Sequence, residues 1–115
     1  MSTHVVTSHG ADFFGQDHYE IRDLTSLAGY AEGCLSVFDG EQLVRLLAHA
    51  GDGDQAVPAD QAAALADLLR RVARHRFTRP KPSALASLLA NAAALAALEG
   101  ESWTWTLTTE TEAAR

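Results

Sequence analysis

The sequence predicts an α+β fold, in which about four helices dominate a single domain that also has a small antiparallel sheet. Its 115 residues suit one domain with one two-layer core. Leucine and alanine recur at helical spacing through the middle of the chain, whereas β-branched or alternating segments lie near both ends. Because unpaired backbone groups are costly, we expect the N- and C-terminal strands to pair with each other.

The N-terminal region predicts a hairpin followed by a helix. Residues 3–9 (THVVTSH) contain consecutive β-branched residues, which favour a strand. After the loop GADFFGQD, residues 18–22 alternate weakly and are the candidate second strand. Asp23 is the expected N-cap of the first helix, whose apolar residues keep helical spacing up to Leu35.

Two more helices are expected in the middle of the chain. In FDGEQL, Asp39 is the expected N-cap, Phe38 is expected to pack against Leu43, and Gly51 should end the helix. The segment GDGDQAV is expected to be a polar connector. Pro58 then opens the most strongly patterned helix, because proline fits the first helical turn.

The C-terminal region predicts one more helix and one more strand. The prolines of FTRPKPS interrupt the preceding helix, and the next helix is expected from about Ser83 to Glu99. The segment SWTWTLTT alternates strictly and places Trp103 and Trp105 on one face, which we expect to lie in the core. The single domain is expected to span 1–115, with a frayed tail at its end, residues 110–115.

Composition limits the class of protein. Apolar runs of about 18 residues are absent, so no membrane span is predicted. The N-terminus lacks the pattern of a signal peptide. Cys34 is the only cysteine, which excludes an internal disulfide and a cysteine zinc cluster. We therefore expect a cytoplasmic protein, and its net charge of −6 argues against general nucleic-acid binding.

Six of the nine basic residues fall in one short stretch. They are Arg70, Arg71, Arg74, Arg76, Arg79 and Lys81. This stretch is a candidate site for an acidic protein surface or for phosphate. The alternative is a helix end whose basic residues complement the helix dipole. Apart from Phe77 the stretch has no aromatic residue, which argues against binding of single-stranded nucleic acid.

A second candidate site lies in SHGADFFGQDHYEIRD. It contains four candidate metal ligands: His9, Asp12, Asp17 and His18. If the two flanking strands pair, the histidines come together, and two histidines with a carboxylate can hold zinc or ferrous iron. The spacing matches no established motif, and the alternative is a polar loop anchored by Phe13 and Phe14. We expect no tightly bound metal and no cofactor.

Three segments, SHGADFFG, VPADQAAALADLLRRVA and SWTWTL, resemble small uncharacterised proteins of actinomycetes, Streptomyces in particular. The resemblance implies no catalytic residues, and the chain lacks nucleophile-elbow, P-loop and dinucleotide-binding motifs. By analogy with other small acidic bacterial proteins, we expect a non-enzymatic interaction protein of the inhibitor, immunity or adaptor type. The alternatives are metal or ligand binding at the loop that contains His9, Asp12, Asp17 and His18, and phosphate or nucleic-acid binding at the basic stretch from Arg70 to Lys81.

Overall fold

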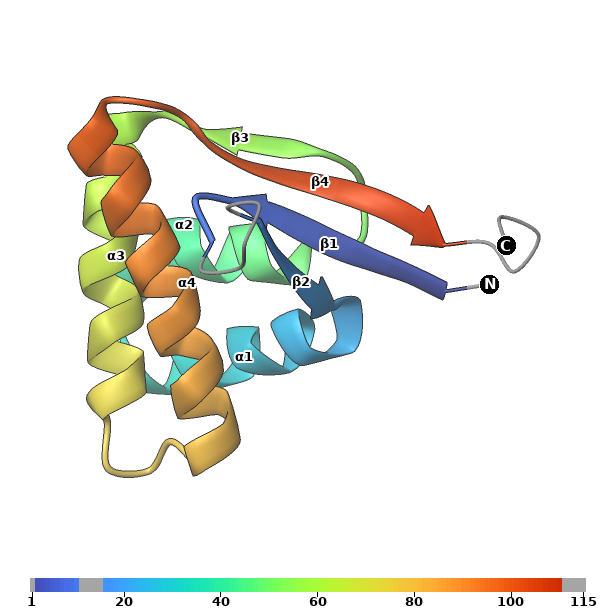
Figure 1. Ribbon diagram of the computed structural model, residues 1–115. Helices are drawn as coiled ribbons and strands as arrows, with labels where there is room; N and C mark the ends of the chain where they lie inside the picture. Colours follow the sequence, from blue (N-terminus) through green and yellow to red (C-terminus); the bar gives the residue numbers. More distant parts are fainter. Residues whose placement is uncertain (1, 11–15, 111–115) are drawn as a thin grey trace.

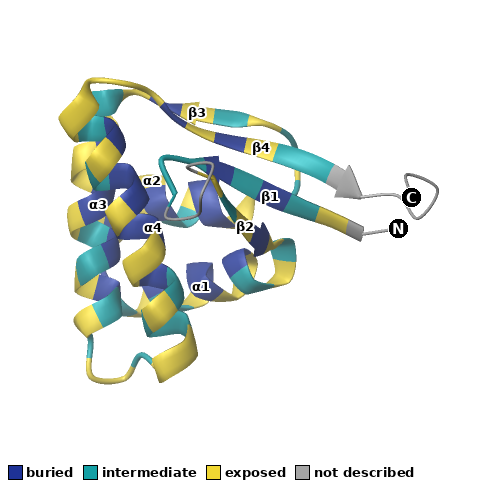
Figure 2. Cartoon of the chain, in the orientation of Figure 1, coloured by how far each residue is buried: buried dark blue, intermediate teal, exposed yellow. Residues whose placement is uncertain are grey.

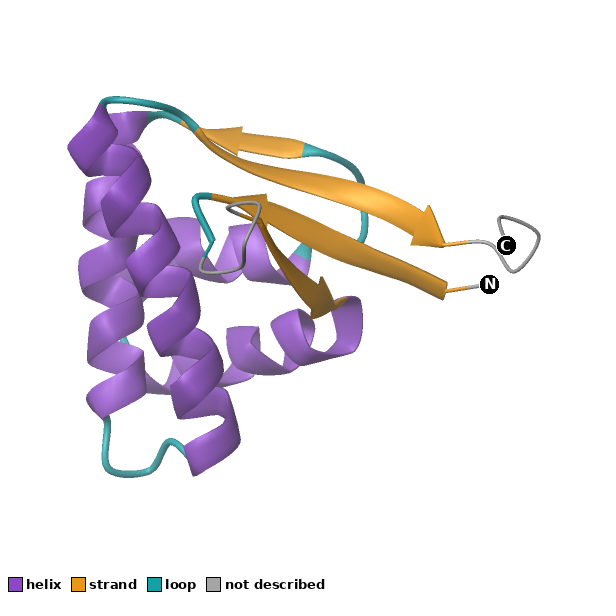
Figure 3. Cartoon of the chain, in the orientation of Figure 1, coloured by secondary structure: helices purple, strands orange, loops and turns teal. Residues whose placement is uncertain are grey.

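The computed structural model describes residues 2–10 and 16–110, which form four helices and a four-stranded antiparallel sheet (Figure 1). The predicted α+β class is therefore confirmed. The helices gather to one side of the strands (Figure 3), and the first and last described residues, Ser2 and Glu110, pair with each other in the sheet.

The sheet joins the two ends of the chain, as predicted. Its strands are β1 (Ser2–Ser8), β2 (Gln16–Glu20), β3 (Gln55–Val57) and β4 (Trp103–Glu110). They lie in the order β2-β1-β4-β3, so the first and last strands are the two central ones. Their antiparallel register runs from Ser2 opposite Glu110 to Thr7 opposite Trp105.

Two predictions about the strands are wrong in detail. The second strand ends at Glu20, because Ile21 and Arg22 already belong to the first helix. The expected polar connector contains β3, which pairs with the start of β4. This short strand forms because it covers one edge of β4 and buries Val57.

Only one face of the sheet is buried. Successive side chains of a strand point to opposite faces, so Val5 and Thr7 of β1 share the inner face with Trp103 and Trp105 of β4. Figure 2 shows this alternation of burial along the strands. Both tryptophans are fully buried, which confirms their predicted place in the core.

The helices are α1 (Ile21–Cys34), α2 (Val37–Ala48), α3 (Ala59–Arg74) and α4 (Pro80–Glu99). α3 and α4 form an antiparallel pair, and α1 and α2 lie beneath the sheet in Figure 1. Alanines of α4 are buried toward its neighbours, and their small size permits close helix packing. α4 ends at Glu99 as predicted, and Gly100 follows it in the left-handed conformation with φ 69°.

Several predicted helix ends are corrected. Asp23 lies inside the first turn of α1, whose N-cap is Glu20. Ser36, not Asp39, caps α2, because its Oγ accepts a hydrogen bond from the Asp39 backbone N–H at 3.1 Å. Phe38 is 93% exposed and therefore forms no staple.

The C-terminal end of α2 and the start of α4 also differ from the prediction. α2 ends at Ala48, before Gly51. α4 begins at Pro80, ahead of the predicted Ser83. Pro80 and Pro82 both fit the first turn, because the backbone N–H groups of that turn have no intrahelical partner. By length and composition, α4 is the one described helix that could cross a membrane, a test that core helices of soluble proteins also pass.

Candidate functional site

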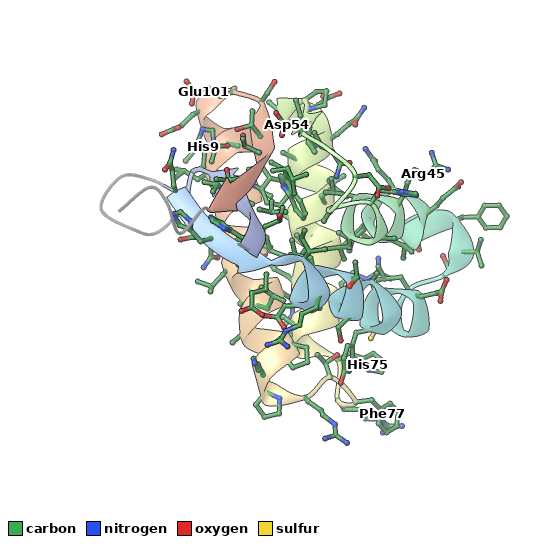
Figure 4. All side chains as sticks on the ribbon, turned by 90° about the vertical axis from the view of Figure 1, so that its right-hand side faces the viewer. His9, Arg45, Asp54, His75, Phe77 and Glu101 are labelled. Carbon is green, nitrogen blue, oxygen red and sulfur yellow. The ribbon has the colours of Figure 1, made fainter. Side chains whose placement is uncertain are left out.

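His9 lies far from the turn between α3 and α4. In Figure 4, His9 and Glu101 lie near the sheet at one end, whereas His75 and Phe77 lie at that turn at the other end. The two candidate sets are not wholly separate, because His18 and Lys81 line one groove.

The turn between α3 and α4 is ordered by its own hydrogen bonds. The backbone N–H of Thr78 donates to the carbonyl oxygen of His75 at 3.0 Å. The N–H of Phe77 donates to His75 Nδ1 at 3.3 Å. We name this surface the basic tip, and it consists of Arg74, His75, Arg76, Phe77 and Arg79. Its side chains thus project from a defined backbone.

Phe77 is the prominent apolar group of the basic tip. Its side chain is 72% exposed. The guanidinium of Arg76 lies 4.9 Å from the centre of the Phe77 ring, within cation–π range. The His75 ring lies 5.6 Å away on the same tip. An exposed aromatic ring therefore lies between a guanidinium group and an imidazole ring.

The six predicted binding residues divide into three groups. Arg70 and Arg71 each lie near a carboxylate, at 3.8 Å from Asp67 and 3.9 Å from Asp39. These two fit the interpretation of an ion-paired helix surface. Arg74, Arg76 and Arg79 lie at the tip, and across residues 2–10 and 16–110 none of them has a carboxylate within 4.0 Å.

Lys81, the sixth residue, faces a different part of the surface. It lines a groove between α4 and α1 together with Leu85 and Leu88. The structure therefore does not bring it into the same cluster as Phe77.

The predicted meeting of His9 and His18 does not occur. The register places His18 opposite Val6, on the outer face of the sheet, where its Nδ1 lies 3.1 Å from His4 Nε2. The centres of the two rings are 5.1 Å apart; His18 is exposed and His4 is half-buried. His9 follows the end of β1 with φ 61°, a left-handed conformation. This change of backbone direction helps to separate it from His18.

The remaining predicted ligands do not complete a metal site with these histidines. Asp12, with the expected anchors Phe13 and Phe14, lies outside the described residues. Asp17 lies opposite Thr7, and its carboxylate accepts a hydrogen bond from the Tyr19 hydroxyl at 3.2 Å. Burial, together with the nearby Asp17 carboxylate, raises the pKa of Tyr19 above its ordinary value of 10.0.

His9 joins a cluster that the sequence did not indicate. Its Nε2 lies 2.8 Å from Glu101 Oε1 and 3.3 Å from Glu99 Oε1. Its Nδ1 lies 2.8 Å from the Ser8 hydroxyl, which accepts a hydrogen bond from the Thr104 backbone N–H at 2.9 Å. The hydrogen bond from His9, followed by the contact with Glu99, lowers the pKa of Glu101.

This His9 cluster connects elements that are distant in sequence. Glu99 ends α4 and Glu101 precedes β4, so no local spacing relates either residue to His9. As it stands, the cluster fixes the end of β1 to the junction of α4 and β4. One imidazole nitrogen and two carboxylates that converge in this way are also donors suited to a divalent cation.

The geometry describes a small α+β domain with a basic tip at one end and a polar cluster at the other. A family model described as "Domain of unknown function (DUF7739)" matches residues 10–106, and the chain belongs to this family. No curated protein and no solved structure matches the chain.

Proposed function

We propose that this protein is a non-enzymatic interaction protein that binds an acidic macromolecular partner through the basic tip. The observation that carries this proposal is the exposure of Phe77 beneath the Arg76 guanidinium. Arginine and aromatic side chains are frequent hot spots of protein interfaces, which means that they supply much of the binding free energy. An inhibitor, immunity or adaptor role fits a domain of this size.

The distribution of charge supports an acidic protein as the partner. Residues 70–81 contain six basic and no acidic residues, which leaves three basic and fifteen acidic residues for the rest of the chain. The tip would attract an acidic surface, while the remainder of the chain would repel the extended phosphate backbone of a nucleic acid. A localised acidic patch is therefore a better match than a long polyanion.

Phe38 offers a matched control surface. It is also exposed, but it lies on α2 beside Asp39 and Glu41, in acidic surroundings. Arg45, on the same helix, is paired with Glu41 at 2.9 Å and lies away from Phe77 (Figure 4). Substitution of one phenylalanine and one arginine can therefore be made at either place.

The test compares capture of proteins from a lysate of the source organism. The tip variant Arg76→Gln/Phe77→Ala should lose a partner that the wild type and the control variant Arg45→Gln/Phe38→Ala both retain. Acidic segments of that partner should cross-link to the tip. Equal capture by the tip variant, or selective loss in the control variant, would contradict the proposal.

Nucleic-acid binding is a distinct outcome of the same experiment. Capture that disappears after nuclease treatment would replace the acidic protein with nucleic acid as the ligand. Binding of a defined oligonucleotide should then weaken steeply with salt, with a slope set by the number of phosphates contacted. Capture that resists nuclease supports the protein partner.

We also propose a cytoplasmic location and an actinomycete origin. The location is supported by the single, half-buried Cys34 and by the absence of any other cysteine in the sequence. The origin is supported by the resemblance of the three sequence segments described above.

A second candidate function is binding of a divalent cation at the His9 cluster. The observation that favours it is the convergence of His9, Glu99 and Glu101, whose ligand atoms lie within 4.8 Å of one another. The Ser8 hydroxyl contacts the other ring nitrogen and would orient the imidazole, as groups behind metal ligands do.

Zinc and manganese test this second function. The wild type should gain thermal stability with one of these ions, His9→Gln should lose the gain, and His4→Gln should keep it. His4 is a suitable control because it contacts His18 on the outer face of the sheet and takes no part in the His9 cluster. Absence of any shift in the wild type would leave the cluster as a hydrogen-bonded connection between β1, α4 and β4.

A further inference from the structure

The exposed side of α4 carries a regular apolar pattern. Between Lys81 and Glu99 the helix contains no charged residue. Five of its exposed positions recur at alternating intervals of four and three residues, with the exposed Ser87 beside them: Ala84, Leu88, Asn91, Leu95 and Leu98. We name this row the α4 stripe. Its spacing is that of the seam of a coiled coil.

An apolar row on the exposed side of α4 is unusual, because the opposite side of the helix is already buried in the core. Leu89 and Ala93 are fully buried, yet Leu88, Leu95 and Leu98 are 43%, 39% and 84% exposed. In Figure 2, exposed segments recur along the length of α4. A helix that is apolar on both sides is expected to be covered on both sides. Its neighbour α3, in contrast, exposes charged residues such as Asp67 and Arg71.

We propose that the α4 stripe packs against the α4 stripe of a second copy of this chain, with the two helices antiparallel. Charge decides the orientation. The stripe is bounded by Lys81 at its N-terminal end and by Glu99 at its C-terminal end, and both are exposed. An antiparallel pair brings Lys81 of each copy beside Glu99 of the other, whereas a parallel pair places like charges together.

Side-chain size supports the same arrangement. A two-fold axis at the middle of α4, between Leu89 and Ala90, places Leu95 opposite Ala84 and Leu88 opposite Asn91 of the second copy. Large side chains would then meet smaller or polar ones along the seam, and a single Asn in such a seam favours one register at some cost in stability.

The surroundings of α4 supply the rest of the interface. A stable interface buries about 800 Å² on each partner, and a 20-residue helix about 30 Å long covers part of that area. Grooves flank the stripe on both sides: Arg70 and Arg74 line one beside Asn91, and Leu27 and Lys81 line the other beside Leu88. These grooves can receive side chains from the second copy.

The test measures the mass of the full chain by light scattering across a concentration series. The wild type should approach twice the monomer mass of 12.3 kDa. Leu95→Asp should remain a monomer with an unchanged helical signal. Phe38→Asp, the matched control at an exposed residue of α2, should still form the dimer. Asn91→Leu should lower the dissociation constant of the dimer. This second variant keeps the test decisive if Leu95→Asp fails to fold.

Orientation is tested with a cysteine introduced at the seam of a Cys34→Ser chain. A mixture of Ala84→Cys and Leu95→Cys chains should form the mixed disulfide in preference to either homodimer. A monomeric wild type at all concentrations, a dimer that Phe38→Asp disrupts, or preferential Ala84→Cys homodimers would each overturn the proposal. Co-flotation of the wild type with lipid vesicles, abolished by Leu95→Asp, would overturn it in favour of a membrane as the occupant.

Discussion

Trp103 and Trp105 meet edge to face beneath the central strands of the sheet, with ring centroids 5.2 Å apart at an interplanar angle of 82°. Both are fully buried, and Trp105 lies opposite Thr7 of β1 on one side and Gln55 of β3 on the other. Aromatic pairs in this geometry add to the stabilisation from buried area. The pair therefore ties the helices to three of the four strands.

We expect Trp105→Ala to lower the free energy of unfolding by about 3–5 kcal/mol, because it leaves a large cavity in the core. Thr106→Ala, on the exposed face of the same strand, is the control and should cost less than about 1 kcal/mol. Urea denaturation measures both. Equal effects of the two substitutions would show that the tryptophan face is not the core.

Removal of β4 should prevent folding. β4 is hydrogen-bonded on both sides, to β1 and to β3, so a fragment of residues 1–101 would lose both ladders and both tryptophans. Circular dichroism should show no cooperative thermal transition for this fragment. A soluble fragment that melts cooperatively would contradict the observed topology.

Two helical glycines should respond to alanine in opposite directions. A Cβ at Gly29 of α1 would meet nothing within 4 Å, so Gly29→Ala should stabilise the protein by about 0.5–1 kcal/mol. A Cβ at Gly40 of α2 would lie 2.9 Å from Leu35 Cβ, so Gly40→Ala should destabilise it by about 1–3 kcal/mol. Chemical denaturation distinguishes them, and destabilisation by Gly29→Ala would contradict the open space beside Gly29 on α1.

The His9 cluster should make stability depend on pH in the acid range. The folded state lowers the pKa of Glu101 from its usual 4.5, chiefly through the hydrogen bond from His9. Its contribution is therefore fully present above about pH 4.5 and is lost as the pH falls through the folded-state pKa. Glu101→Gln should reduce this acid dependence in thermal melts. An unchanged profile would show that the hydrogen bond is not maintained in solution.

Much of the fold could be predicted because its main elements carry strong periodic patterns. Strict alternation identified the buried face of β4, and the leucine spacing identified the helices. The cap of α2 could not be chosen in this way, since Ser36 and Asp39 are both good capping residues and only the three-dimensional structure selects one. β3 is three residues long, too short for a pattern, and it forms because β4 offers a free edge.

The candidate sites were predictable only where their residues are neighbours in sequence. The clustering of arginines around Phe77 is local, and the turn between α3 and α4 keeps it together. The partners of His9 are not local, because Glu99 and Glu101 reach it only after β1 pairs with β4. The prediction that His18 lies beside His9 is wrong, because its neighbour is His4. Strand register, which the sequence does not reveal, decides this pairing.

The central claim is that the basic tip contacts an acidic partner, and site-specific photo-cross-linking in cells of the source organism tests it most directly. A photoreactive amino acid in place of Phe77 should yield a discrete protein adduct, whereas the same group in place of Phe38 should not. The adduct should weaken when Arg76→Gln is added. No adduct at Phe77, or the same adduct from both positions, would contradict the claim that this surface is the binding site.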